Sequence, residues 1–117
     1  LADARKGIAM FREPKIDVPV LGIVENMAWF TPERHPEERY YLFGKEGAAH
    51  LAEELNVPLL AQIPVTETIC DSGDNGKPIA LGDNITAQAF AHLARVVIEA
   101  VDTRNITLPP TKAVLAK

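Results

Sequence analysis

The stretch Val18-Pro19-Val20-Leu21-Gly22-Ile23-Val24, followed by Glu25-Asn26, decides the fold. It is a nearly continuous apolar run with several β-branched residues. Such a run is typical of a strand that is buried on both faces of a parallel sheet. A second run, Val57 to Pro64, has the same character, and its early proline is tolerated at the start of a strand. The two runs predict an α/β fold with a mostly parallel sheet.

Amphipathic helices are predicted before and between these strands. Before the first strand, Ala4, Ile8 and Phe11 recur on one helical face, and Pro14 ends the helix. Between the strands, the same spacing predicts a helix that ends at Asn56, a residue able to take the left-handed conformation. The apolar positions of this second helix are Ala48, Leu51, Ala52 and Leu55.

A third, long helix follows the second strand. Residues 66–84, which separate the two, are rich in turn-forming residues, and Asp83 or Asn84 is placed to cap the helix. Its apolar face carries Ile85, Ala89, Phe90, Leu93, Val97 and Val101. Residues 102–117 contain Pro109-Pro110 and no firm period, which predicts a tail.

The alternation of helix and strand predicts βαβ units with helices on both sides of the sheet. Two strands make a small sheet, however, and a parallel pair buried on both faces normally belongs to a larger one. The chain also begins without methionine, inside a helical pattern. We therefore expect residues 1–101 to be the C-terminal half of a longer domain, incomplete without its N-terminal half, with residues 102–117 as a tail. Leu51 and Leu59 are expected in the core.

The connection after the first strand is expected to be irregular. Residues 31–39 are polar and contain two prolines, which predicts a solvated, mobile loop without an apolar anchor. Tyr40-Tyr41-Leu42-Phe43, which follows, is interpreted as either a short strand or a packed turn.

The composition is that of an ordinary globular protein. Hydrophobic residues make up 47% and charged residues 24%, a balance that supports an apolar core. A net charge of −4 gives no reason to expect nucleic acid or an anionic membrane as a partner. No apolar run approaches the roughly 18 residues that span a bilayer, and a lone cysteine cannot form an internal disulfide. These features favour a cytoplasmic protein.

No catalytic or metal site is expected from the residues alone. His35, His50 and His92 are scattered singly, and Cys70 has no second cysteine with which to bind zinc or an iron–sulfur cluster. Cys70 is therefore interpreted as a small packed residue. Gly73–Pro78 contains a Gly-Lys pair, but it lacks the first glycine of a phosphate-binding loop and has proline in the Ser/Thr place. We interpret it as a surface turn.

The ends of the two strands are the candidate binding positions, because ligands bind beyond the carboxyl ends of strands in open parallel sheets. Asn26 follows the first strand, and its amide can both donate to and accept from the edge of an adenine. The alternative is an asparagine that only forms a turn. Pro64, with Val65, ends the second strand and could flank a base, or could simply terminate the strand. Trp29 and Phe30 could stack on a ligand or anchor a loop.

Taken in order, five motifs carry a resemblance to a known family: Val18–Met27, Leu42–Gly47, Leu51–Leu60, Ile63-Pro64 and Asp74–Pro78. Together they resemble the C-terminal half of the Mrp/ApbC-type ATPases. These proteins are relatives of MinD with a deviant Walker A loop, and they act as iron–sulfur cluster carriers. The resemblance covers residues 1–100 and includes the opening helix.

The resemblance implies a P-loop NTPase sheet, and ATP binding with slow hydrolysis across a homodimer that serves iron–sulfur client proteins. The family position that reads the base matches Asn26, and the loop that lines the base matches Pro64 and Val65. The family's Walker A loop, switch residues and Mg²⁺ ligand fall upstream of Leu1. The resemblance therefore implies an ATPase as the parent protein, whereas this chain alone is expected to have no catalytic activity.

One difference from the family concerns the cluster. Many members carry Cys-Pro-x-Cys between the Glu-Asn-Met strand end and the Phe-Gly turn, whereas Ala28–Leu42 contains no cysteine here. The resemblance to an ATPase therefore does not extend to the usual cluster ligands. A second interpretation, which this difference favours, is a MinD-like scaffold that uses ATP to dimerise and has no cluster role. A third is a free-standing flavodoxin-like module, which needs a complete sheet of about five strands.

Overall fold

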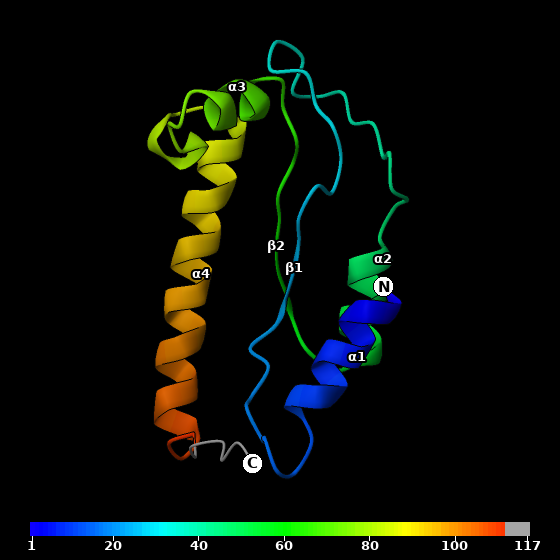
Figure 1. Cartoon of the computed structure of the whole chain (residues 1–117), viewed down its shortest axis with the longest axis vertical. Helices are drawn as coiled ribbons and strands as arrows, with labels where there is room; N and C mark the ends of the chain where they lie inside the picture. The colour runs from blue at the N-terminus through cyan, green and yellow to red at the C-terminus, as the bar shows by residue number, and fades with distance from the viewer. Residues whose placement is uncertain (112–117) are drawn as a thin grey trace.

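The computed structural model describes residues 1–111, without the side chain of Cys70. Residues 112–117, the end of the expected tail, and the predicted packing of Cys70 lie outside the described part. Figure 1 shows the arrangement of the elements along the long axis of the molecule. In chain order these are α1 (Ala2–Phe11), β1 (Ile23–Glu25), α2 (Gly47–Glu54), β2 (Leu59–Gln62), α3 (Thr68–Asp74), a 3-10 turn η1 (Ile79–Leu81) and α4 (Ile85–Thr107).

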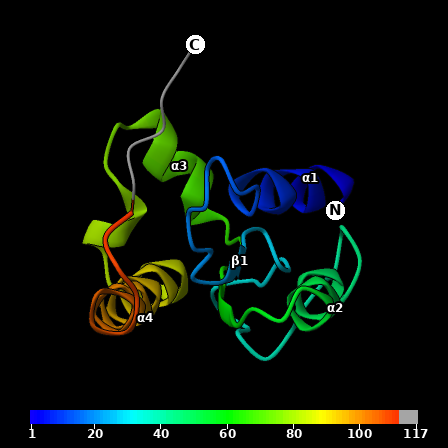
Figure 2. The ribbon, with the colours of Figure 1, turned by 90° about the horizontal axis from the view of Figure 1, so that it is seen from below.

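The strands β1 and β2 form a two-stranded parallel sheet, in which Glu25 pairs with Gln62. Helix α4 lies along one side of the pair and α2 along the other (Figures 1 and 2). The predicted alternation of helices with parallel strands is thus confirmed. Two strands among residues 1–111 do not form the complete sheet that a flavodoxin-like module requires.

Both strands are shorter than their apolar runs predict, and their residues are more exposed to solvent. Residues 18–22 lie half-buried outside the ladder, and Val24 keeps 39% of its surface exposed. Burial of the first run on both faces is therefore wrong in this structure. The physical reason is that β1 has a neighbouring strand on one edge only within the described range, and a two-stranded sheet offers too little surface to cover its own strands.

Gly22 allows the two strand segments to approach each other closely. A Cβ atom at this position would lie 2.7 Å from the Pro58 carbonyl oxygen and 2.5 Å from Cγ of Leu60. The Pro58 oxygen also accepts a hydrogen bond from the Ile23 N–H, at 2.9 Å. The missing side chain therefore lets β1 begin directly against the backbone that leads into β2.

Helix α2 supplies most of the fully buried residues on its side of the sheet. Ala48, Leu51 and Ala52 are buried, as predicted, and Asn56 takes a left-handed φ of 56° just after the helix. Leu51 is only 1% exposed, which confirms it as a core residue. Leu59 is half-buried, so its assignment to the core is wrong, because β2 is covered less completely than the prediction assumed.

Helix α1 forms as predicted, but its apolar face is not buried. Ala4, Ile8 and Phe11 line an apolar groove of about 380 Å³ together with residues 18–20. Polar contacts hold α1 on α2 instead: Arg5 forms an ion pair with Glu54, and the side-chain hydrogen bond lowers the pKa of the Glu54 carboxyl. Arg12 Nη2 also donates to the Leu55 carbonyl at 2.9 Å.

The segment 66–84 contains more regular structure than its turn-rich composition suggests. It holds α3 and η1, which sequence analysis missed because both are short and the segment has no apolar period. Residues Gly73–Pro78 end α3 and turn the chain at Gly76, whose φ is +64°. Gly73 lies within the last turn of α3 and Gly76 follows the helix, whereas a phosphate-binding loop leads into a helix. The interpretation as a turn therefore agrees with the structure from Asn75 onward.

Helix α4 begins where predicted and ends later. The Asn84 Oδ1 accepts a hydrogen bond from the Ala87 N–H at 2.8 Å, which confirms the cap. The helix continues through Thr107, so residues 102–107 of the expected tail are helical. Pro109 explains the observed end, because a proline disfavours helical backbone in the residue before it. None of the helices in residues 1–111 combines the length and apolar character needed to cross a membrane.

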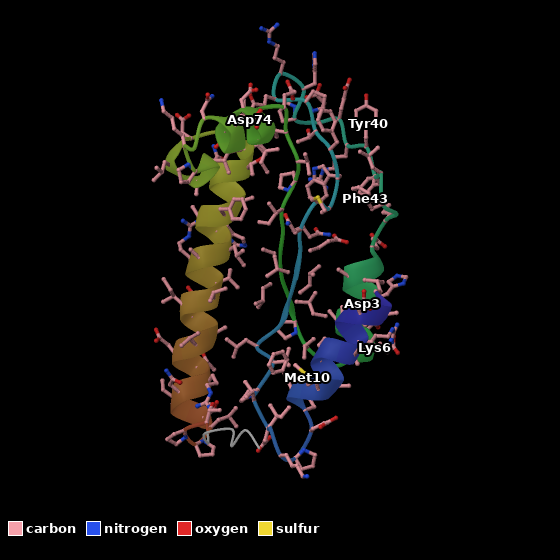
Figure 3. The ribbon with its side chains drawn as sticks, in the orientation of Figure 1. Asp3, Lys6, Met10, Tyr40, Phe43 and Asp74 are labelled. Carbon is pink, nitrogen blue, oxygen red and sulfur yellow. The ribbon has the colours of Figure 1, made fainter. Side chains whose placement is uncertain are left out.

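The loop after β1 is anchored at both of its ends. Phe30 and Tyr40 pair in antiparallel fashion through two main-chain hydrogen bonds of 2.8 Å, and Thr31 is 1% exposed. Residues 34–39 are exposed, as expected for a solvated loop, and the contacts that hold the loop at its ends are main-chain and polar rather than apolar. From Tyr40 the chain runs past Phe43 along the outer connection that leads to α2 (Figure 3). Phe43 is 76% exposed, so the packed-turn interpretation is wrong there.

We expect Gly22→Ala to destabilise the chain by about 1–3 kcal/mol, since a new methyl group would meet the Pro58 carbonyl. The matched control is Gly7→Ala in α1, where a Cβ atom meets nothing within 4 Å. That substitution is expected to stabilise the chain by roughly 0.5–1 kcal/mol. Chemical denaturation measures both values, and equal midpoints for the two variants would contradict the close approach.

Leu51→Ala is expected to cost about 2–5 kcal/mol of unfolding free energy, the usual range for emptying a closed core site. Leu59→Ala should cost clearly less, because water already reaches part of the Leu59 side chain. The comparison uses the same denaturation experiment. Equal losses would show that the two leucines do not differ in burial in solution.

Candidate functional site

The carboxyl ends of β1 and β2 meet at one end of the molecule, where α4 begins and the 31–39 loop lies (Figure 1). Beyond the two strands, main-chain pairing continues. The Ile63 N–H donates to the Glu25 carbonyl at 2.8 Å, and the Ala28 N–H donates to the Ile63 carbonyl at 3.0 Å. The residues after the two strands are therefore held side by side, which is the position where open parallel sheets bind ligands.

Asn26 lies at this edge, exposed to solvent. Its Oδ1 accepts a hydrogen bond from the N–H of Met27 at 3.0 Å, and Met27 has a left-handed φ of 54°. In this structure Asn26 thus stabilises a turn, which is the alternative role considered for it. Its side chain also lines a cavity of about 290 Å³ that β1 shares with α2 and with the turn at Phe43 and Gly44.

Pro64 and Val65 follow β2 at the same edge. Pro64 is buried, and its carbonyl oxygen lies 3.4 Å from the Thr86 hydroxyl of α4. The N–H of Val65 donates to the Trp29 carbonyl at 2.8 Å, and the Val65 carbonyl accepts from the Thr31 N–H at 3.0 Å. The structure brings Asn26, Pro64 and Val65 to one edge of the sheet, but the cavity lined by Asn26 does not include the other two.

A buried cluster of threonines supports the turn at Pro64, and sequence analysis missed it. Thr66 and Thr86 are 1% and 0% exposed, and their hydroxyl oxygens lie 3.1 Å apart. The Thr66 hydroxyl also lies 3.3 Å from that of Thr68. Threonine is common on surfaces, and these three positions come together only through the fold, so the sequence offers no strong signal for them.

Glu33 joins the 31–39 loop to this cluster. Its Oε1 accepts a hydrogen bond from the Thr68 hydroxyl at 2.6 Å, and its main-chain N–H donates to Glu67 Oε1 at 2.9 Å. Within the loop, the Thr31 hydroxyl donates a hydrogen bond to the carbonyl oxygen of Pro36 at 3.4 Å. The loop therefore packs against the turn at Pro64 through polar contacts.

Trp29 contacts Arg39 and Tyr41 at the other end of the loop. The Arg39 guanidinium carbon lies 4.0 Å from the Trp29 ring centroid, and the ring of Tyr41 is 6.1 Å away from it. A cation over an indole face is attracted by the ring's quadrupole. Trp29 thus anchors the loop in this structure, which was the more usual of its two expected roles.

One group of potential metal ligands occurs among the described residues. Single ligand atoms of His35, Glu37 and Glu38 lie within 4.8 Å of one another, and all three residues are exposed. Sequence analysis missed this group because it considered the histidine without its acidic neighbours. The hydroxyl of Tyr40 donates to Glu38 at 3.1 Å, which raises the pKa of Tyr40. We interpret the group as surface charge pairs and assign no metal to it.

Comparison with known proteins matches residues 1–98 to the ParA family, described as the NUBPL iron-transfer P-loop NTPase. The chain is 36% identical over 106 residues to an iron-sulfur cluster carrier protein of Aquifex aeolicus, covering 89% of this chain and 28% of that protein. It is 34% identical over 107 residues to the iron-sulfur cluster transfer protein NUBPL of Dictyostelium discoideum, covering 90% and 32%.

A third relative is the mitochondrial iron-sulfur protein required for NADH dehydrogenase of Arabidopsis thaliana, at 39% identity over 101 residues, with 85% of this chain and 31% of that protein covered. The chain thus spans roughly 30% of the length of these relatives. The matched residues 1–98 include both strands, the three candidate positions and the threonine cluster. On this match, the chain belongs to the ParA/NUBPL family of iron-transfer P-loop NTPases.

Proposed function

We propose that the chain forms the nucleotide-base side of an ATP-binding protein. In its complete form, this protein binds ATP with Mg²⁺, hydrolyses it slowly and takes part in iron–sulfur cluster assembly or transfer. The family match over residues 1–98 carries the proposal. Relatives named as iron-sulfur cluster carrier and transfer proteins support it. The proposed ligand is an adenine nucleotide, and the proposed partners are iron–sulfur client proteins.

In this proposal Asn26 reads the edge of the base, while Pro64 and Val65 line it. Support comes from the position of all three residues at the carboxyl ends of parallel strands, where such sheets bind nucleotides. To reach a base, the Asn26 side chain must turn away from the Met27 N–H that it now accepts from. Asn26 is exposed, so little packing opposes that turn.

Binding of the phosphates and of Mg²⁺, and hydrolysis itself, are proposed to depend on residues outside this chain. Phosphoryl transfer depends mainly on contacts to the phosphates, on Mg²⁺ and on a positioned water. Residues 1–101 are proposed to be the C-terminal half of the P-loop domain, followed by a tail over 102–117 that begins within the last turns of α4. A homodimer and a cytoplasmic location remain predictions from the sequence.

A second candidate function is that of a MinD-like scaffold, which uses ATP to dimerise and recruit partners without carrying a cluster. The absence of cysteine from Ala28–Leu42 favours this alternative. In the structure, that interval is occupied by the anchored loop, with Glu33 and Trp29 in contact with neighbouring segments. Reconstitution of the complete protein with iron and sulfide separates the two: cluster absorbance supports a carrier, and its absence supports a scaffold.

In the complete protein, we expect Asn26→Ala to weaken ADP binding about fivefold, which corresponds to the loss of one hydrogen bond of about 1 kcal/mol. The preference for ADP over GDP should also fall. Asn105→Ala, on the exposed part of α4, is the matched control and should bind as the wild type does. Titration calorimetry measures both, and unchanged affinity and selectivity in Asn26→Ala would remove this residue from the site.

The 117-residue chain alone should neither hydrolyse ATP nor bind it tightly. Contacts to the base supply a few hydrogen bonds and some stacking, which little more than offset the entropy lost on association. The measurement is a turnover assay with Mg²⁺ and ATP on the purified chain. Activity that persists through further purification would reveal a phosphate site within these residues.

A further inference from the structure

The turn that ends α3 carries an asparagine followed by a glycine, Asn75-Gly76. Both residues are exposed, and a Cβ atom at Gly76 would meet nothing within 4 Å. The main-chain nitrogen that follows Asn75 is therefore crowded neither by a side chain of its own nor by a packed neighbour. The other asparagines in the sequence precede methionine, valine or isoleucine instead: Asn26, Asn56, Asn84 and Asn105.

The way in which α3 ends explains the glycine. The Gly76 N–H donates to the Gly73 carbonyl at 3.2 Å, and the Lys77 N–H donates to the Ser72 carbonyl at 3.0 Å. This pair of bonds ends a helix at a left-handed residue, and Gly76 has a φ of +64°. The Ser72 hydroxyl also donates to the Lys77 carbonyl. Asn75 and Gly76 thus form the tip of a closed turn that faces solvent.

We propose that Asn75 is a site of spontaneous modification, in which its side-chain amide is lost as ammonia. The Gly76 main-chain nitrogen gives up its proton, attacks Cγ of Asn75 and forms a new C–N bond. The bond from Cγ to Nδ2 breaks, and the leaving nitrogen takes up a proton to become ammonia. The product is a succinimide ring. Water then adds to either ring carbonyl and opens the ring, which leaves aspartate or isoaspartate at position 75.

The turn must open before this reaction can occur. In the closed turn, the Gly76 N–H points to the Gly73 carbonyl rather than to Cγ of Asn75. That hydrogen bond, at 3.2 Å, is at the long end of the usual range. Exposed helix ends with few packed neighbours also open at low free-energy cost. Glycine then permits the backbone rotation that brings its nitrogen to Cγ.

Asn56 provides an internal comparison. It is also exposed and also follows a helix, α2. The next residue, however, is Val57, whose N–H donates to the Ala52 carbonyl at 2.9 Å. A branched Cβ is stiff and crowds the attacking nitrogen. Asn75 is therefore expected to react before Asn56, although the two asparagines occupy similar places in the fold.

The reaction would change the turn in its charge and in its backbone. Either product places a carboxylate beside Asp74 at the C-terminal end of α3, where the helix dipole disfavours negative charge. Isoaspartate also lengthens the main chain by a carbon atom, so the pairing of Ser72 with Lys77 loses its register. Asn75 and Lys77 line a cavity of about 420 Å³ with residues of α3 and η1, and one wall of it would change. None of this depends on the proposed function.

The test incubates the complete protein in mildly alkaline buffer, in which main-chain amides lose protons more readily, and follows each asparagine by peptide mass spectrometry. We expect Asn75 to lose its amide at least about tenfold faster than Asn56, which corresponds to an activation free energy lower by about 1.4 kcal/mol. Both aspartate and isoaspartate should appear at position 75. Asn75→Gln is the matched variant, because it keeps the amide but forms the larger ring less readily, and it should release less ammonia.

Hydrogen exchange at the Gly76 and Lys77 main-chain amides measures the effect on the turn. Exchange should become faster as isoaspartate accumulates. The Ala87 N–H, which donates to the Asn84 cap of α4, is the internal control and should exchange as before. Unchanged exchange at Gly76 and Lys77 in fully converted protein would overturn the proposed effect on the turn.

The remaining outcomes decide the modification itself. Equal rates at Asn75 and Asn56 overturn the inference, because they remove the role of the glycine. An Asn75 amide that persists in the folded protein and is lost only in urea also overturns it, since the closed turn then protects the residue. Aspartate without isoaspartate indicates direct hydrolysis and overturns the ring mechanism. Preferential conversion at Asn75 to both products supports the inference.

Discussion

The main-chain pairing between the segment from Ile23 to Thr31 and the segment from Pro58 to Val65 is the interaction on which the rest of the structure depends. It begins as a parallel ladder and continues past the strands, through the hydrogen bonds of Ala28 to Ile63 and of Thr31 to Val65. Both helical layers rest on it, with α4 on one side and α2 on the other. Without this register, the residues after the two strands would not share an edge.

Sequence patterns predicted the parts of the fold that depend on local periodicity. The helix over Gly47–Glu54, its end at Asn56 and the cap at Asn84 all follow from spacing and side-chain type, and the structure confirms them. The predictions that failed concern burial, which depends on how many strands and helices surround a segment. An apolar run such as 18–24 indicates burial but does not reveal how many strands and helices surround it, and here they are few.

In the candidate site too, the sequence predicted the positions that follow from local pattern and missed those that depend on tertiary contacts. Asn26, Pro64 and Val65 could be proposed from the sequence because they follow predicted strands. The threonine cluster could not, because Thr66 and Thr86 are far apart along the chain and no residue pattern connects them. If the proposed function holds, base selection and phosphate chemistry are carried by different parts of the protein. Selectivity could then be changed by substitutions in this chain without altering the hydrolytic step itself.

Trp29 is the only tryptophan in the sequence. Its ring lies under Arg39, and its carbonyl accepts from Val65, so one residue contacts both the loop after β1 and the turn after β2. The tryptophan fluorescence of the chain therefore originates where these two segments meet. Any event that moves Arg39 off the indole or repacks the turn would change the emission locally, so the wild-type chain reports on this edge of its sheet without an attached dye.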